Sequence, residues 1–89
     1  MTRIFKYPLK VVDHQLVNMP KGAVVRHVDV QHEVPCVWAE VDPSQSMEER
    51  GFVIVGTGHE IPYKDRLAFR GTFMLNDGNF VGHVYEERV

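Results

Sequence analysis

The sequence has a single cysteine, no long apolar run and no dense basic cluster, and each of these absences excludes a class of protein. One cysteine, Cys36, cannot form an internal disulfide, so the fold must be stabilised by its core and suits a reducing compartment. No stretch approaches the roughly 20 apolar residues that cross a bilayer. No apolar segment of signal-peptide length follows Arg3 and Lys6. We therefore expect no membrane association and a protein that stays where it is made.

Basic residues are few and unevenly distributed. Residues 1–26 carry five basic residues against Asp13, a balance of +4 that leaves −6 for the remainder of a chain whose net charge is −2. Nucleic-acid-binding proteins usually present a dense basic surface with stacking aromatic residues, and an acidic body repels phosphate. The charge distribution therefore argues against nucleic acid as a partner.

What the sequence does contain is typical of a small globular β protein. The 89 residues are 44% hydrophobic and 25% charged, which suits one folded domain and excludes a second. β-Branched and aromatic residues form short runs separated by Pro, Gly, Asn and Asp. We predict a single all-β domain over residues 1–89, either a small antiparallel β-sandwich or a partly open barrel of about seven short strands.

The expected strands follow these runs. They cover residues 3–9, 15–19, 24–31, 36–41, 52–55, 67–75 and 80–85. Pro8 has no N–H to donate, so it should lie in an edge strand or at the end of a strand. A hairpin around residues 32–35 joins the third and fourth strands, although an Asn-Gly turn, which such a hairpin favours, is missing there. Residues 42–46 form a loop, and the polar stretch to Arg50 is expected to add a helical turn.

Burial can be predicted for several side chains. In the last hairpin, a period of two places four apolar side chains on one face. They are Leu67, Phe69, Phe73 and Leu75, while Arg70 and Thr72 point the other way. Residues 76–79 supply the turn. Trp38 stands among apolar neighbours and is expected to anchor the core.

The stretch that follows the most apolar strand is the candidate ligand site. Gly56, Thr57 and Gly58 could present backbone N–H groups to an anion, and His59 could add a donor. Phosphate-binding loops of real specificity carry a third glycine or a lysine before Ser or Thr, and neither is present. A sheet exit with positive φ at Gly58 is the favoured interpretation. The alternative is a ligand-binding set of Gly56, Thr57, Gly58 and His59, with His83 close by.

Metal and cofactor sites are not indicated. The chain has five histidines: His14, His27, His32, His59 and His83. Zinc sites gather three or four ligands, marked in sequence by closely spaced pairs on a helix face or in a tight knuckle. No such pair occurs here. We expect neither a metal nor a cofactor.

Catalysis is not indicated either. Cys36 lies in an apolar strand, where cysteine is usually a small buried hydrophobic residue. The acidic pairs Glu48-Glu49 and Glu86-Glu87 fall near a loop and near the end of the chain, where solvation is expected. No serine lies in a Gly-x-Ser-x-Gly context. We expect a protein that is not an enzyme.

Five stretches together resemble a family of short, uncharacterised bacteriophage and prophage proteins. They contain the motifs KYPL, PCVWAEVDP, GTGH, GTF and HVYE, within residues 4–9, 34–43, 56–59, 71–73 and 83–86. The resemblance covers nearly the whole chain. It implies a viral accessory protein working in the cytoplasm of a host bacterium, with no activity to assign to particular residues.

Three functions remain in play. The first is a non-enzymatic accessory protein that binds and sequesters or inhibits a host protein or a small signalling molecule, as an anti-defence factor would. The second is a structural or assembly component of the phage particle. The third is a small enzyme acting on a nucleotide-like substrate. Because residues 52–55 are apolar on both faces, the second face must meet a loop, the turn near residues 43–50 or another subunit, and we expect a homodimer.

Overall fold

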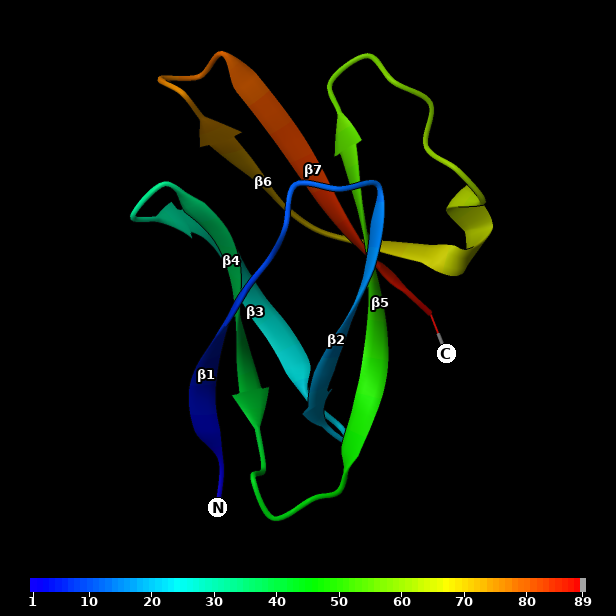
Figure 1. Cartoon of the computed structure of the whole chain (residues 1–89). Helices are drawn as coiled ribbons and strands as arrows, with labels where there is room; N and C mark the ends of the chain where they lie inside the picture. The colour runs from blue at the N-terminus through cyan, green and yellow to red at the C-terminus, as the bar shows by residue number, and fades with distance from the viewer. Residues whose placement is uncertain (89) are drawn as a thin grey trace.

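The computed structural model describes residues 1–88, which fold into two antiparallel sheets packed face to face (Figure 1). The three-stranded sheet has the order β1 (Arg3–Pro8), β4 (Val34–Val41), β3 (Val24–Gln31). The four-stranded sheet has the order β2 (His14–Pro20), β5 (Met47–Gly56), β7 (Phe80–Glu87), β6 (Leu67–Leu75), and a short 3-10 helix, η1 (Lys64–Arg66), precedes β6. The predicted all-β class is confirmed as an open sandwich, and β1 lies at an edge as expected. Within the described residues, no helix has the length and apolar character needed to cross a bilayer.

The strand β5 begins earlier than the sequence predicted. Residues 47–50 were expected to form a polar helical turn, but they belong to β5 and pair with β2, with Val17 opposite Arg50 and Met19 opposite Glu48. Local propensity is weak in this stretch, and the ladder of hydrogen bonds with β2 decides its conformation. The prediction of a helical turn is therefore wrong.

The β3–β4 hairpin is closed by a two-residue turn without asparagine or glycine. His32 has φ 52° and Glu33 has φ 65°, so both central residues are left-handed, as tight hairpin turns of the primed type require. As a result β4 starts at Val34, two residues before the predicted strand. The expected hairpin is confirmed, at the cost of backbone strain at two side-chain-bearing residues.

The main core lies between the sheets, and Trp38 is not part of it. Alternation along β4 turns Val37, Ala39 and Val41 inward, where all three are buried. Trp38 points outward, is half-buried, and stacks at 5.9 Å between ring centroids against His27 of β3. The prediction that Trp38 anchors the core is wrong because its neighbours on both sides in the chain occupy the inward positions.

A bulge in β6 divides the apolar face predicted for the last hairpin. The register with β7 shifts between Phe69 and Gly71. Leu67 and Phe69 therefore lie on the outer face, whereas Phe73 and Leu75 pack in the main core. The hairpin itself is confirmed, but the single shared face is wrong.

The glycine at this bulge permits close packing of the two sheets. A Cβ at Gly71 would lie 2.7 Å from Cβ of Val28 on β3, closer than packed carbon atoms come. A side chain at this position would push β6 away from β3. The bulge thus turns the preceding residue, Arg70, inward while the backbone stays close to the facing sheet.

The outer face of β5 is covered within the chain. Val53 and Val55 pack with Leu67, Ile61 and Tyr85 in a second, smaller apolar cluster. The connection between β5 and β6 supplies part of this cover (Figure 1). Of the covers expected for this face, the loop is the one found, so the face itself gives no reason for a second subunit.

Candidate functional site

The glycine-rich stretch forms a turn at the end of β5. The His59 N–H donates to the Gly56 carbonyl at 3.1 Å, and Gly58 has φ 89° at the third position of the turn. Positive φ at this position is typical of a type II turn, and the prediction for Gly58 is confirmed. The Thr57 N–H donates to the carbonyl of Val81 at 3.4 Å. Because these two amides are already paired with backbone carbonyls, the stretch is a sheet exit rather than a nest of free N–H groups.

His83 is fixed beside this turn by two threonine hydroxyls. Its Nε2 lies 2.7 Å from Thr57 Oγ1, and its Nδ1 lies 2.9 Å from Thr72 Oγ1. One threonine comes from the turn after β5 and the other from β6, which is the next strand to β7. Because both ring nitrogens have hydroxyl partners, the ring orientation is set by the protein itself.

The residues of the predicted ligand set lie together. Gly56, Thr57, Gly58, His59 and His83 all line a shallow depression of about 240 Å³. Small-molecule sites usually measure roughly 300 to 1,000 Å³. The depression is thus small for a ligand site, and binding by this set stays a prediction.

A larger pocket lies on the other side of the same turn, and we call it the loop pocket. It measures about 620 Å³. Its lining residues are Val11, Asp13, His14, Val53, Ile54, Val55, Gly56, His59, Glu60, Pro62, Tyr63 and Phe80. The connection between β1 and β2 forms one wall and the connection between β5 and β6 forms another. Val55, Gly56 and His59 line both hollows.

The loop pocket exists because β2 is shorter than β5 at this end. β2 begins at His14, opposite Val53, and the last contact between the strands is the Ile54 N–H donating to the Asp13 carbonyl at 3.2 Å. Residues 55 and 56 extend past this point, which leaves the edge of β5 open toward the pocket. Sequence patterns did not reveal the pocket because its walls come from segments about 45 positions apart, joined by the pairing of β2 with β5.

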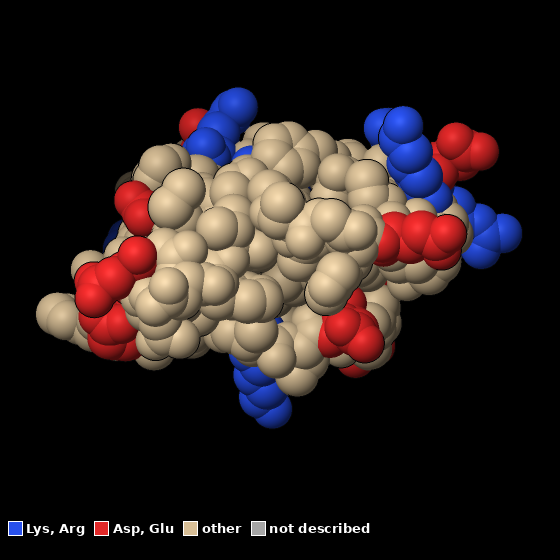
Figure 2. Space-filling model, turned by 90° about the horizontal axis from the view of Figure 1, so that it is seen from above, with Lys and Arg blue, Asp and Glu red and all other residues tan. Residues whose placement is uncertain are grey.

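Carboxylates are the charged groups of the loop pocket. Asp13 and Glu60 line it, and the lining residues in the described chain include no Lys or Arg. His14 is held by Glu87, with Nε2 3.3 Å from Oε1. Within residues 1–88, the side chains of Asp13, His59 and Glu60 make no hydrogen bond or ion pair. Figure 2 views the molecule from this end, with uncharged residues in the middle and charged side chains around them.

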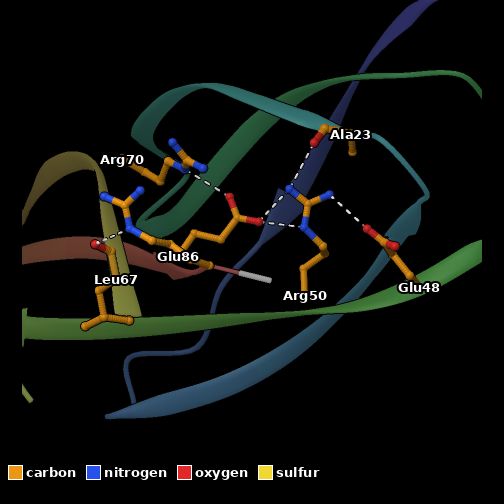
Figure 3. Close-up of polar contacts among 7 residues, drawn as sticks. Ala23, Glu48, Arg50, Leu67, Arg70 and Glu86 are labelled. Carbon is orange, nitrogen blue, oxygen red and sulfur yellow. Dashed lines mark hydrogen bonds and ion pairs between the residues drawn. The ribbon is translucent and has the colours of Figure 1, made fainter. Parts of the chain in front are cut away.

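A second group of charged residues lies between the sheets, where Glu86 and Arg50 are buried and Arg70 and Glu48 reach the surface. Glu86 is 2% exposed, and its carboxylate accepts hydrogen bonds from Arg50 Nε at 2.6 Å and Arg70 Nε at 2.9 Å (Figure 3). Arg50 also donates to the Ala23 carbonyl at 2.9 Å and lies 3.5 Å from a carboxylate oxygen of Glu48. We call these residues the charge cluster. Its polar atoms satisfy one another, which indicates a structural role.

The charge cluster corrects one prediction from the sequence. Glu86 was expected to be solvated with Glu87 near the end of the chain, but β7 alternation turns Glu86 inward beside Val84 while Glu87 faces out. Its burial is possible because the β6 bulge brings Arg70 to it from one side. Arg50 of β5 approaches from the other.

The remaining candidates have no visible chemistry. Cys36 is buried at 1% exposure, as expected of a small hydrophobic residue in a strand. In residues 1–88, no group of three His, Cys, Asp or Glu side chains is placed to hold a metal ion. The loop pocket is the larger of the two hollows beside the glycine-rich turn, and it offers polar groups to a ligand.

The family of the protein can be stated from sequence comparison. A family model described as "Domain of unknown function (DUF7352)" matches residues 1–89, and the chain belongs to that family. No curated protein and no solved structure matches the chain. Family membership thus assigns no activity to the chain.

Proposed function

We propose that this member of the DUF7352 family is a non-enzymatic binding protein that holds a small ligand in the loop pocket and acts by stoichiometric sequestration. The observation that carries the proposal is the pocket itself. Its volume of about 620 Å³ falls in the middle of the range of small-molecule sites. Apolar walls with a few polar groups are the usual composition of such sites.

The lining supports binding over covalent catalysis. Among the described residues that line the loop pocket there is no Ser, Thr, Cys or Lys, the side chains that most often act as activated nucleophiles. His14, which could act as a base, is held by Glu87 at 3.3 Å and is not paired with a nucleophile. The pocket therefore offers contacts to a ligand without a Ser, Thr, Cys or Lys nucleophile to attack it.

The lining also disfavours a nucleotide-like substrate. Phosphate groups are usually bound by Arg, Lys or converging backbone amides. Asp13 and Glu60 would repel phosphate in the loop pocket, and the amides of Thr57 and His59 in the neighbouring turn are already paired. Of the three functions considered, the lining favours sequestration of a small molecule over catalysis on a nucleotide-like substrate.

The resemblance to short bacteriophage proteins supports the place of action. A viral accessory protein of this size would act in the cytoplasm of an infected bacterium. Because it has no catalytic turnover, it would need about one copy for each target molecule that it sequesters. A small host metabolite or signalling molecule fits a pocket of this volume better than a protein surface does. We therefore place the ligand among the small molecules of the host cell.

Native mass spectrometry tests the proposal. The protein is incubated with a small-molecule extract of bacterial cells, and the variant Tyr63→Ala removes an aromatic wall of the pocket, with Phe69→Ala as a matched control on an exposed outer position. We expect a one-to-one adduct with wild type and Phe69→Ala that Tyr63→Ala loses. An adduct retained in full by Tyr63→Ala, or no adduct with any protein, contradicts the proposal.

A separate surface favours self-association, which would also suit an assembly component of a particle. The outer face of the three-stranded sheet carries exposed Ile4 and Val24 on either side of Glu40, and half-buried Trp38 lies two positions before Glu40 on β4. Tryptophan is enriched at the energetic centres of interfaces. We propose that this face, rather than β5, joins two copies of the chain.

Light scattering tests self-association through this face. We expect a mass of about twice 10.3 kDa for wild type and for Met74→Asp, a control on the other sheet, and the monomer mass for Ile4→Asp. A wild-type mass near 10.3 kDa that does not change on concentration contradicts the dimer.

A further inference from the structure

We infer that the loop pocket takes a small organic cation, namely a protonated amine or amidine carried on an apolar or aromatic body. This inference rests on the proposed function and names the chemical class of its ligand. It follows from three properties of the pocket: its charge, its aromatic and apolar walls, and the way the backbone fixes its polar groups.

The charge of the pocket selects for a cation. Asp13 and Glu60 contribute two carboxylates, and the described lining residues include no Lys or Arg to offset them; of the two lining histidines, His14 already lies 3.3 Å from Glu87. Neither carboxylate is neutralised by an ion pair within residues 1–88. A cation in the hollow would gain attraction from both, and an anion would be repelled by both.

The walls suit the body of such a ligand. Val53, Val55 and Pro62 provide apolar surface, and two aromatic rings, Tyr63 and Phe80, line the same hollow. Aromatic faces attract ammonium and amidinium groups through the ring quadrupole. A ligand with a charged nitrogen and an apolar body would thus satisfy both kinds of surface at once.

The backbone that carries the two carboxylates is ordered before a ligand arrives. The Asp13 carbonyl accepts a hydrogen bond from the Ile54 N–H at 3.2 Å. This bond fixes the backbone of Asp13 against β5, and the carboxylate extends from that fixed backbone. In an antiparallel strand, the N–H groups of alternate residues point to the same edge, so the N–H of Gly56 points to the same open edge as the N–H of Ile54. Glu60 follows directly on the turn closed by the His59 N–H and the Gly56 carbonyl. Such pre-ordering lowers the entropy cost of binding.

The size of the pocket favours a free molecule over a side chain of a partner protein. A volume of about 620 Å³ accommodates a whole small molecule, and a single Lys or Arg side chain would leave much of it empty. The occupant we commit to is therefore a free organic cation, and a basic side chain of a peptide is an alternative for the experiment to detect.

Three probes of one shape test the inference at neutral pH and low salt. Benzylamine is a cation, benzyl alcohol is neutral and benzoate is an anion, and each is titrated into ¹⁵N-labelled protein. We expect benzylamine to shift the amides of residues 13–14, 54–56 and 59–63, and to bind about fivefold or more tightly than benzyl alcohol. Benzoate should bind more weakly still.

Matched variants assign the effect to the carboxylates. Asp13→Asn and Glu60→Gln should each weaken benzylamine binding about two- to fivefold, because partly exposed charges contribute modestly. Glu49→Gln removes the same charge from an exposed position on β5, outside the loop pocket, and should leave the affinity unchanged. The spectra of the free variants show whether each one is folded.

Several results would overturn the inference. Benzoate binding as tightly as benzylamine, no shift with benzylamine, or unchanged affinity in both carboxylate variants would each do so. Binding of a capped lysine peptide without binding of benzylamine would identify a partner protein instead. If benzylamine fails but the bacterial extract still gives an adduct that Tyr63→Ala loses, the cation is wrong and the binding function stands. If both fail, both are wrong.

Discussion

The two ends of the sandwich differ in the pairing of their charged side chains and in the backbone conformation of their turns. At one end, which we call the locked end, the β2–β3 turn and the β4–β5 loop lie near the charge cluster, where Glu86 is buried and paired with two arginines. At the other, the loop end, the connections that line the loop pocket carry the carboxylates of Asp13 and Glu60, which form no ion pair within residues 1–88. Figure 1 shows these connections at the top of the sandwich. Within residues 1–88, the non-glycine residues with positive φ also lie at the loop end: His32, Glu33, Tyr63, Asn76 and Asp77.

This difference distinguishes the residues that stabilise the fold from the residues that are free to contact a ligand. Buried charges that satisfy one another fix a structure and leave nothing for a ligand. Left-handed backbone at residues with side chains costs energy, and such strain collects where function requires a particular geometry. We therefore propose that the locked end stabilises the fold and that the loop end binds a ligand, and the following predictions test that division.

Removing the buried carboxylate should have the largest effect. Glu86→Ala leaves the guanidinium groups of Arg50 and Arg70 without their shared partner in a mostly buried site. We expect the free energy of unfolding to fall by about 3 to 5 kcal/mol, measured by urea denaturation. The neighbouring variant Glu87→Ala removes a partly exposed carboxylate and should cost less than about 1 kcal/mol. Equal losses in the two variants would mean that the charge cluster does not stabilise the fold.

Relieving strain at the loop end should raise stability. Glu33 has φ 65° in the β3–β4 turn, and glycine adopts this conformation without steric cost. We expect Glu33→Gly to increase the free energy of unfolding by about 0.5 to 1 kcal/mol, the strain relief being partly offset by the entropy of glycine. Glu49→Gly, in the middle of a strand, is the control and should destabilise. A loss of stability in Glu33→Gly would show that the backbone of this turn is not strained.

Acid should weaken a turn at the locked end. The Asp42 carboxylate accepts hydrogen bonds from the Ser44 hydroxyl at 2.7 Å and the Ser44 N–H at 3.0 Å, and these bonds lower the pKa of Asp42. Because the folded pKa lies below the unfolded one, the stabilisation is present above the ordinary value of about 4 and is lost as pH falls through the folded pKa.

Thermal melts of Asp42→Ala against wild type measure this contribution. We expect a small deficit in Tm at pH 7 that shrinks below pH 4, and Ser44→Ala should show part of the same pattern. A deficit that is constant between pH 7 and pH 2 would rule out the carboxylate as its source.

The smallest effect on stability is expected from the carboxylates of the loop pocket. Asp13 and Glu60 make no hydrogen bond or ion pair through their side chains within residues 1–88. The double variant Asp13→Asn with Glu60→Gln should therefore unfold within about 0.5 kcal/mol of wild type. A clear loss in this variant would show that the pocket carboxylates support the fold.

The sequence predicted the parts of the fold that local patterns determine. The hairpin of β6 and β7 follows from the turn residues Asn76, Asp77 and Gly78 between two apolar runs. Positive φ at Gly58 follows from the steric freedom of glycine at a turn. The predicted ligand residues were also brought together with His83, because β5 and β7 are neighbours in the sheet.

What local patterns could not predict depends on strands that meet across the chain. Glu86 looked solvated because its partner Arg50 lies 36 positions away and Arg70 turns inward through a bulge. Asp13 and Glu60 share a pocket because β2 pairs with β5. The outward position of Trp38, by contrast, follows from the two-residue period of a strand, because Val37, Ala39 and Val41 occupy the inward positions of β4.

The most direct test of binding at the loop end is a map of backbone amide shifts in ¹⁵N-labelled protein on addition of a small-molecule extract of bacterial cells. We expect the shifts to concentrate in residues 11–14, 53–63 and 80, which surround the loop pocket, while residues 21–23 and 42–50 at the locked end do not move. Shifts at the locked end or on the outer face of the three-stranded sheet, or no shifts anywhere in the spectrum, would contradict binding at the loop end.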